Sequence, residues 1–281
     1  MDCAGRTGLD EALPMEDTAP RRRRRMRRPL GATMAVVRDV CGGLVAVVAI
    51  WQAAIWLFQP PGYMLPAPAD VIAVLAERHD MLLRNAAITL SEALLGLLFG
   101  TLAGAAAAIG MAASPLANRL AWPLLLVLQA IPVFAIAPLL VVWFGFGLAS
   151  KVVMTSLVIF FPVTSAFADG IRRTDPFLLD ACALTAATRW QTLMAVRVPM
   201  ALPGFISGLR VAAPLAPLAA VVGEWVGAAG GLGFLMIQAN ARMQTGDVFA
   251  ALFILAVLTL ALRACVDAAT ARLVPWQREA P

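Results

Sequence analysis

The chain alternates between long apolar segments and short polar ones, and six apolar segments have about the 20 residues that a helix needs to cross a bilayer. These predicted spans are Val40–Phe58, Ala86–Met111, Leu120–Phe144, Val152–Ala168, Ala201–Val222 and Val248–Val266. Backbone polar groups must pair with one another in lipid, which favours helices, and the strand-length alternation of a membrane barrel is absent. The pattern therefore predicts an all-α, polytopic membrane protein with six transmembrane helices.

Composition agrees with this pattern. Of the 281 residues, 61% are hydrophobic and 14% are charged, whereas soluble domains carry about 25% charged residues. Such a chain lacks the polar surface that a soluble core requires, so the bilayer is its expected surroundings. We expect one transmembrane domain, residues 33–281, after a polar tail, residues 1–32.

The tail contains the run RRRRRMRR, for which there are three interpretations. It can anchor the chain beside anionic lipid. Nucleic-acid binding is disfavoured because no folded basic domain accompanies the run, and a cleaved signal is disfavoured because no clear small-residue cleavage site follows. We expect a disordered basic cytoplasmic tail and no nucleic-acid partner.

Arginine placement predicts the orientation, because basic residues gather on the cytoplasmic side. With the N-terminus inside, 17 of the 22 basic residues lie inside or in the tail, and Arg78, Arg84, Lys151 and Arg242 lie outside. Discarding the tail leaves nine against four. Both termini are therefore predicted to be cytoplasmic.

Few residues offer catalytic chemistry. The chain has one histidine, His79, one lysine, Lys151, and four scattered cysteines, which disfavours a membrane enzyme or a metal site. A P-loop needs a lysine followed by Ser or Thr, and Val152 follows Lys151, so we expect no ATP bound by this chain. The glycine-rich run at 230–233 is interpreted as a turn or re-entrant element.

Two features concern packing and a pathway. Gly96, Gly100 and Gly104 form a four-residue repeat that predicts close approach of another helix. Polar residues in the spans are candidates for a pathway, and the predicted set is Glu92, Gln129 and Arg210 within the membrane and Glu224, Trp225, Asn240 and Gln244 at the outer mouth. Glu92 and Arg210 could form an ion pair, or serve packing alone, and the mouth residues could meet cargo or a docking protein, or cap helices.

A long cytoplasmic loop, Asp169–Pro199, carries its own helix signals. Asp175 and Pro176 predict the start of a short helix, and Thr188 with Gln191 fits a capping box that opens a second. Trp190, Leu193, Met194 and Arg197 fall on one face of that second helix. This face could bind a partner protein or pack on the chain's own spans.

The loop resembles the EAA loop of ABC importer permeases, which runs Glu-Ala-Ala, three residues, Gly, nine residues, Ile, one residue, Leu-Pro. The corresponding positions here are Asp180, Ala181, Cys182, Ala186, Val196, Val198 and Pro199. Ala181 and Pro199 match the motif, and Asp180, Val196 and Val198 are close substitutes. Cys182 and Ala186 depart from the motif, and Ala186 stands where a glycine makes the turn between the helices. From Leu65 to Trp276 the chain is similar to permeases of the nitrate/sulfonate/taurine type, through LPAPADV, IPVFAIAPLLVVWFGFGLASK and LPGFISGLRVA. The segment Val221–Thr245 resembles permeases for the pyrimidine precursor of thiamine.

This resemblance implies the type I ABC importer permease fold in a bacterial inner membrane. It implies a homodimer, two cytoplasmic ATPase subunits that carry ATP and Mg, and an extracytoplasmic substrate-binding protein. The loop, through Asp180, Ala181, Ala186, Trp190, Leu193, Val196 and Pro199, would couple the ATPases to the spans. The cargo would be a small polar solute, either a thiamine pyrimidine precursor or a sulfonate- or nitrate-type anion. An ion-coupled secondary transporter is the alternative, since Pro132 and Pro138 could break a helix, although no second half of the chain mirrors them.

Overall fold

The computed structural model describes the backbone of residues 30–271 and 273, and the side chains of residues 42, 43, 45–271 and 273. Nearly all of the predicted tail, residues 1–32, lies outside the described residues. The chain divides into two units, residues 1–51 and 52–281. Helix α1 (Leu30–Phe58) contains the whole first predicted span, but its described apolar part, Val45–Phe58, is shorter than a span requires. The count of six spans therefore remains a prediction.

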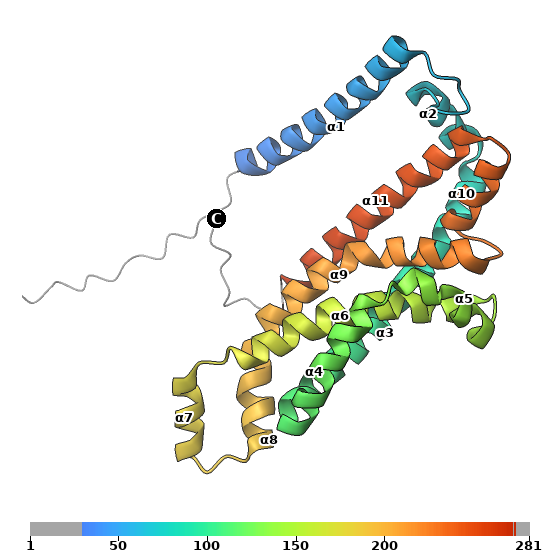
Figure 1. Cartoon of the computed structure of the whole chain (residues 1–281). Helices are drawn as coiled ribbons and strands as arrows, with labels where there is room; N and C mark the ends of the chain where they lie inside the picture. The colour runs from blue at the N-terminus through green and yellow to red at the C-terminus, as the bar shows by residue number, and fades with distance from the viewer. Residues whose placement is uncertain (1–29, 272, 274–281) are drawn as a thin grey trace, which may run out of the picture. The chain divides into compact units, whose positions relative to one another are not determined.

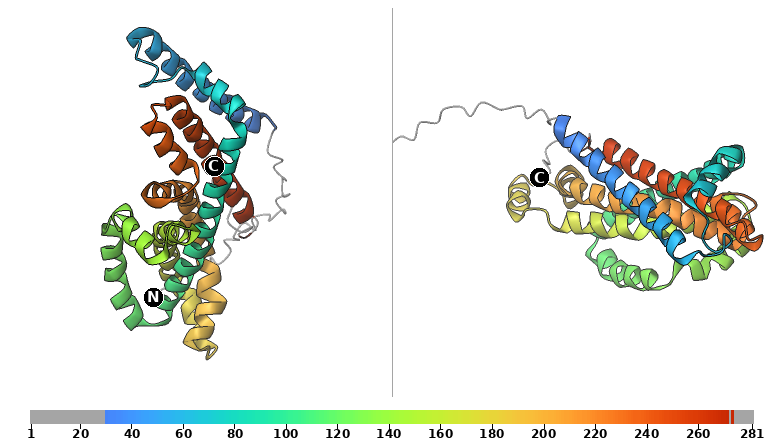
Figure 2. Two further views of the ribbon diagram at one scale, coloured as in Figure 1. Left: turned by 90° about the vertical axis from the view of Figure 1, so that its right-hand side faces the viewer. Right: turned by 90° about the horizontal axis from the view of Figure 1, so that it is seen from above.

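All regular structure in the described part of the chain is helical. After α1 the elements are α2 (Pro68–Glu77), α3 (His79–Ala113), α4 (Pro115–Ala130), α5 (Val133–Phe144), α6 (Leu148–Arg172), α7 (Pro176–Leu184), α8 (Arg189–Thr192), the π-helical turn η1 (Leu193–Arg197), α9 (Val198–Gly227), α10 (Leu232–Ala241) and α11 (Thr245–Thr270). Figure 1 shows the short helices α7 and α8 at the end of the second unit that lies opposite α10, and Figure 2 shows the same end from two other directions.

Four helices among the described residues are long and apolar enough to cross a membrane. They are α3, α6, the continuous run Arg189–Gly227 and α11. The all-α, polytopic prediction is thus confirmed. Every one of these helices extends beyond its predicted bounds, because charged and polar residues at span ends continue the helix.

The predicted third span, Leu120–Phe144, contains Pro123, Pro132 and Pro138 and is not one straight helix. The chain bends by 95° between α4 and α5. The cause is Pro132: proline has no N–H to donate and pushes the preceding residue out of the helical region. Accordingly, Ile131 is extended, with φ −79° and ψ 120°. The pair can form one broken span or a re-entrant loop.

Helix α6 is sandwiched between α3 and α9 through glycines. A Cβ at Gly100 of α3 would lie 2.7 Å from both Ile159 Cβ and Ser156 O of α6, and one at Gly208 of α9 would lie 2.9 Å from Pro162 O. The predicted close approach at the glycine repeat is confirmed, and α6 is the partner. The three helices enclose a core in which Ala93, Ile159, Val163, Ala212 and Ala216 are fully buried. Close helix packing of this kind fixes the polar side chains that the same helices carry.

Candidate functional site

The loop helices form as the sequence predicts. The Asp175 carboxylate accepts a hydrogen bond from Phe177 N at 2.9 Å, and Pro176 opens α7. Thr188 and Gln191 form a reciprocal capping box: Gln191 Oε1 accepts from Thr188 N at 2.9 Å, and Thr188 Oγ1 accepts from Gln191 N at 3.2 Å. These caps satisfy backbone donors that have no partner inside the helix.

The turn between the loop helices places a non-glycine residue in the left-handed region. Ala186 has φ +55°, which is the conformation that a glycine adopts without cost and an alanine does not. The departure from the EAA motif at this position therefore leaves the turn geometry in place and adds backbone strain.

The loop exposes a different apolar face from the one predicted. Trp190 is 56% exposed, but Leu193 is only 2% exposed and packs with Phe167 and Ile171 inside the bundle. Leu193 is thus unavailable as an anchor for a partner, and the alternative of packing on the chain's own spans holds for it. Phe177 and Leu184 of α7, which the sequence analysis missed, are also exposed in this loop. Their signal was present: they are large apolar residues on a nine-residue helix that follows a polar turn.

The remaining predicted loop residues are more solvent-exposed than Leu193. Asp180, Ala181 and Ala186 are exposed, and Val196 and Pro199 are half-buried. A cavity of about 620 Å³ lies between the loop helices and the end of α3 and the start of α4, and its lining includes Trp190, Arg189 and Arg197.

Three ionisable side chains meet deep in the bundle at the α10 end. Glu92 of α3 is 4% exposed, and Lys151 of α6 and Glu224 of α9 are each 1% exposed. The carboxyl groups of Glu92 and Glu224 contact each other, and the Lys151 ammonium interacts electrostatically with both. Lys151 was predicted to lie in an outer loop, and its burial in the first turn of α6 corrects that prediction.

Glu224 fixes the start of α10. Its carboxylate accepts hydrogen bonds from Thr89 Oγ1 at 2.6 Å and from Gly233 N at 2.5 Å. Leu232 N donates to Thr89 Oγ1 at 2.8 Å. The helix-capping alternative for Glu224 is therefore correct, and α10 begins on polar groups of α3 and α9.

The predicted turn or re-entrant element at 230–233 is a bend at Gly230 and Gly231 that leads directly into α10. Gly231 has φ +108°, and a Cβ on it would collide with the Glu224 carboxyl group. Gly231 N donates to Asn85 Oδ1 of α3 at 2.8 Å. Glycine is therefore required here by both backbone conformation and space.

Lys151 binds the turn before α6 and the C-terminal end of α9. Its ammonium donates to Phe146 O at 2.8 Å, in the turn before α6, and also to Gly227 O, at the end of α9. A buried ammonium thereby receives acceptors that a bilayer cannot supply.

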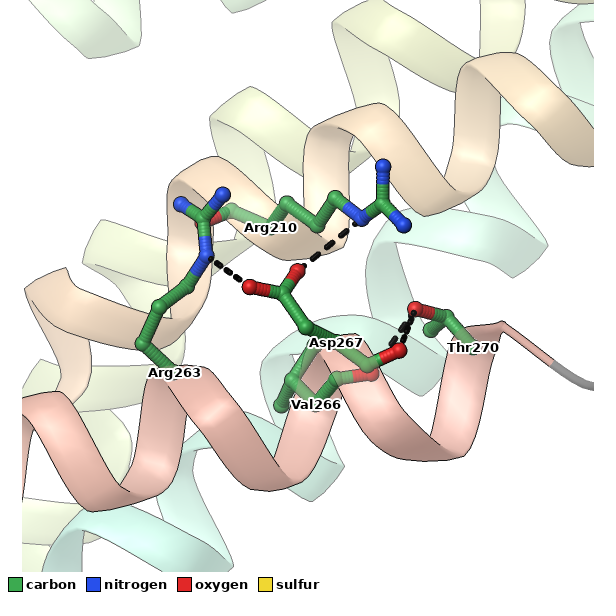
Figure 3. Close-up of polar contacts among 5 residues, drawn as sticks. All are labelled: Arg210, Arg263, Val266, Asp267 and Thr270. Atoms are coloured by element: carbon green, nitrogen blue, oxygen red, sulfur yellow. Dashed lines mark hydrogen bonds and ion pairs between the residues drawn. The ribbon is translucent and has the colours of Figure 1, made fainter. Parts of the chain in front are cut away.

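The suggested ion pair between Glu92 and Arg210 is wrong. Arg210 of α9 pairs with Asp267 of α11, with its Nε 3.0 Å from the Asp267 carboxylate. Arg263 Nε lies 2.9 Å from the other oxygen of the same carboxylate, and Arg263 also donates to Arg210 O at 2.6 Å. Figure 3 shows Asp267 between the two guanidinium groups. This cluster lies near the C-terminal end of α11, far along the bundle from Glu92.

The predicted mouth residues are only partly brought together. Trp225 and Asn240 line a cavity of about 330 Å³ with Met236, Ile237 and Val248. Gln244 is exposed at the start of α11, and Gln129 is exposed in the last turn of α4. Asp247, which the sequence analysis missed, is buried beside this mouth and pairs with Arg78 at 2.7 Å.

A helical bundle with four long apolar helices among its described residues is the architecture of a polytopic membrane protein. Residues 96–279 match the family of binding-protein-dependent transport system inner membrane components. The chain belongs to this family. It is a multi-pass inner membrane permease component of an ABC importer, a role that implies ATPase and binding-protein partners and leaves catalysis to another subunit.

Related sequences extend over most of the chain. A probable ABC transporter permease protein of Haemophilus influenzae is 48% identical over 78% of this chain and 89% of that protein. The formylaminopyrimidine transport permease protein of Halalkalibacterium halodurans is 33% identical over 83% and 93%. The riboflavin transport system permease protein of Chloroflexus aurantiacus is 33% identical over 96% and 99%.

The fold is also similar to a solved structure. The MetNI methionine ABC transporter, in inward-facing conformations, matches with a TM-score of 0.61 at 19% identity, over 70% of this chain and 97% of that chain. At this identity the similarity shows the fold alone, which is that of a type I importer permease.

Proposed function

We propose that this permease carries a small, neutral, planar heteroaromatic solute of the thiamine pyrimidine-precursor type. The observation that carries the proposal is the cavity at the α10 end, lined by Trp225, Met236, Ile237, Asn240 and Val248. None of these five side chains is charged. The flat indole of Trp225 suits stacking against a ring, and the Asn240 amide can both donate and accept hydrogen bonds.

The size of the cavity agrees with such a cargo. About 330 Å³ is at the lower end of the range for small-molecule pockets. A sulfonate or nitrate anion would find no cationic partner in this lining. Relatives whose names give a formylaminopyrimidine and riboflavin, both flat heteroaromatic molecules, support the same class.

The test is growth and uptake with two cargo classes. Deletion of the gene in a thiamine-requiring strain should abolish growth on a pyrimidine precursor and leave growth on taurine as sulfur source intact. Trp225→Ala should lower uptake of the labelled precursor about tenfold, whereas Trp225→Phe, which keeps a ring, should lose less. Loss of taurine use with intact precursor use would reject this cargo.

One observation favours the anionic alternative. The cluster of Arg210, Arg263 and Asp267 places two guanidinium groups within the bundle, and guanidinium groups bind anions through charge-assisted hydrogen bonds. If Arg263→Gln reduced uptake of taurine in a strain that uses it, the anionic class would be favoured. The ion-coupled secondary transporter is set aside, because the family couples transport to ATP.

We also propose that the chain acts as a homodimer, with both termini cytoplasmic and the α7–α8 loop docked on the ATPase. The exposed Phe177, Leu184 and Trp190 support docking, since large apolar anchors dominate interface energies.

Trp190→Ala should weaken co-purification of the ATPase about tenfold or more, and Asp180→Arg should impair it by reversing a charge at the contact. Tyr63→Ala is the control, because Tyr63 is also 56% exposed but lies outside the loop. Unchanged ATPase association in both loop variants would refute the docking site.

A further inference from the structure

The buried ionisable groups at the α10 end connect three regions that are distant in sequence: α3, the start of α6 with the turn before it, and the end of α9 with the start of α10. Glu224 joins α9 to the start of α10 and, through Thr89, to α3. Lys151 joins α6 to the turn at Phe146 and to the end of α9. These bonds hold the short helix α10 and the α5–α6 turn against the three central spans.

Hydrogen bonding in this cluster is unevenly distributed. Both oxygens of Glu224 are used, and Lys151 donates to two carbonyl groups. By contrast, Glu92 Oε2 and Thr155 Oγ1 are buried without a hydrogen-bond partner among the described residues. Buried polar groups in a static scaffold are almost always paired, because an unpaired one costs free energy. Glu92 Oε2 can therefore accept another hydrogen bond. Lys151 is close enough to interact with Glu92 electrostatically.

This arrangement offers Lys151 two sets of partners. In the observed set, the ammonium binds the carbonyl oxygens of Phe146 and Gly227. In the other set it would bind the Oε2 atom of the Glu92 carboxyl group, an exchange that keeps a buried cation paired throughout and so avoids the cost of desolvating it alone. Leaving the two carbonyls would free the α5–α6 turn and the end of α9. A bistable element of this kind is what a coupled opening requires.

We propose that Glu92, Lys151 and Glu224 form a two-position lock: it holds the α10 end of the permease closed, and it releases when Lys151 exchanges its carbonyl partners for Glu92. The inference rests on the chain's role as an importer permease, whose cargo-receiving end must open in step with ATP use. Glu224 and Lys151 stabilise the closed position, and Glu92 stabilises the open one. The three residues are positioning residues, and none is required to touch cargo.

The lock predicts opposite effects for different members of the cluster. Lys151→Met and Glu224→Gln weaken the closed position, so ATP hydrolysis without binding protein should rise about fivefold, the low end of coupling between linked sites. Glu92→Gln replaces the carboxyl group that receives Lys151, so hydrolysis stimulated by the binding protein should fall about fivefold. A purely structural role would shift all three variants in the same direction.

The experiment uses the permease reconstituted in proteoliposomes with its ATPase subunits, and hydrolysis is measured with and without the binding protein. Thr164→Val is the matched control: Thr164 is fully buried on α6, and among the described residues its hydroxyl bonds only to Phe160 O of its own helix, so both rates should stay at the wild-type level. Absence of stimulation in the wild-type protein would refute the importer role itself. Normal stimulation in the wild type, with equal or no changes in the three variants, would overturn the lock alone.

A second measurement does not depend on variants of the cluster. A Cβ at Gly230 would lie 2.8 Å from Ile88 Cδ1 of α3, so cysteines at these two positions, in a chain whose four native cysteines are replaced, should form a disulfide across the closed end. Oxidation should then stop transport, and reduction should restore it. Transport that continues at the wild-type rate in the cross-linked protein would show that this end does not open there, and the lock would be rejected.

Discussion

At the scale of single residues, Ala186 combines an alanine side chain with a backbone conformation suited to glycine. Its φ of +55° brings Cβ close to the neighbouring carbonyl, at a cost of about 1–2 kcal/mol. The surrounding caps at Asp175 and Thr188 hold the two short helices in place regardless. The loop is therefore less stable than it would be with a glycine at position 186.

Ala186→Gly should therefore raise the stability of the protein by about 1 kcal/mol, seen as a higher midpoint of thermal unfolding in detergent. Ala181→Gly is the control, because Ala181 lies inside α7 and glycine in a helix interior costs about 1 kcal/mol. If Ala186→Gly lowered the midpoint as Ala181→Gly does, the strain assigned to this turn would be wrong.

At the scale of helices, the face of α3 that packs on α6 has no room for side chains at its glycines, whereas Gly110 of the same helix has open space around it. Gly96, Gly100 and Gly104 abut α6, whereas a Cβ at Gly110 of the same helix would meet nothing within 4 Å. The contact between α3 and α6 thus depends on three positions in the middle of a 35-residue helix. The same contact sets the positions of Glu92 and Lys151, one turn before Gly96 and Thr155.

Gly100→Ala should destabilise the protein by about 1–3 kcal/mol, because its methyl group would force Ile159 and the α6 backbone away. Gly110→Ala should be neutral or slightly stabilising, since it adds helix propensity without a clash. Thermal unfolding in detergent measures both variants. Equal midpoints for the two would mean that α6 can shift freely along the glycine face.

At the scale of the whole molecule, features that depend on neighbouring residues could be predicted from the sequence. The pairing of charged side chains between helices could not, because it depends on the length and rotation of each helix. The helix caps, the glycine face and the turn at 230–233 follow from nearby residues and were predicted. The partner of Arg210 was missed because the sixth predicted span ended at Val266, one residue before Asp267, and the fifth began at Ala201 although the helical run starts at Arg189. With both helices cut short, Arg210 was placed too near the middle of the membrane.

The partner of Glu92 was missed for a related reason. Lys151 was assigned to a loop because it is charged and lies at a span boundary, whereas α6 begins at Leu148 and buries it. Which face of α9 carries Glu224 toward Glu92 is set by packing on α6, and no pattern within α9 alone specifies it.

Orientation across the membrane is tested by cysteine labelling at both ends of the second unit. With a membrane-impermeant maleimide added to intact spheroplasts, Glu77→Cys at the end of α2 should react at once. Phe177→Cys in the loop should react only after the membrane is permeabilised, because arginine placement puts the loop inside. Both side chains are exposed, so access to reagent is not limited by the fold. Labelling of Phe177→Cys in intact cells would invert the topology.

The bend between α4 and α5 has a consequence for hydration inside the membrane. A helix that ends leaves its last four carbonyl groups without partners from its own backbone, and Pro132 has no N–H to offer. Hydrocarbon cannot satisfy those carbonyls, so a broken helix at membrane depth must face water or another polypeptide. Gln129, exposed in the last turn of α4, adds an amide to the same place. At membrane depth, the 95° bend should therefore contact water or protein, and lipid acyl chains should be excluded from it.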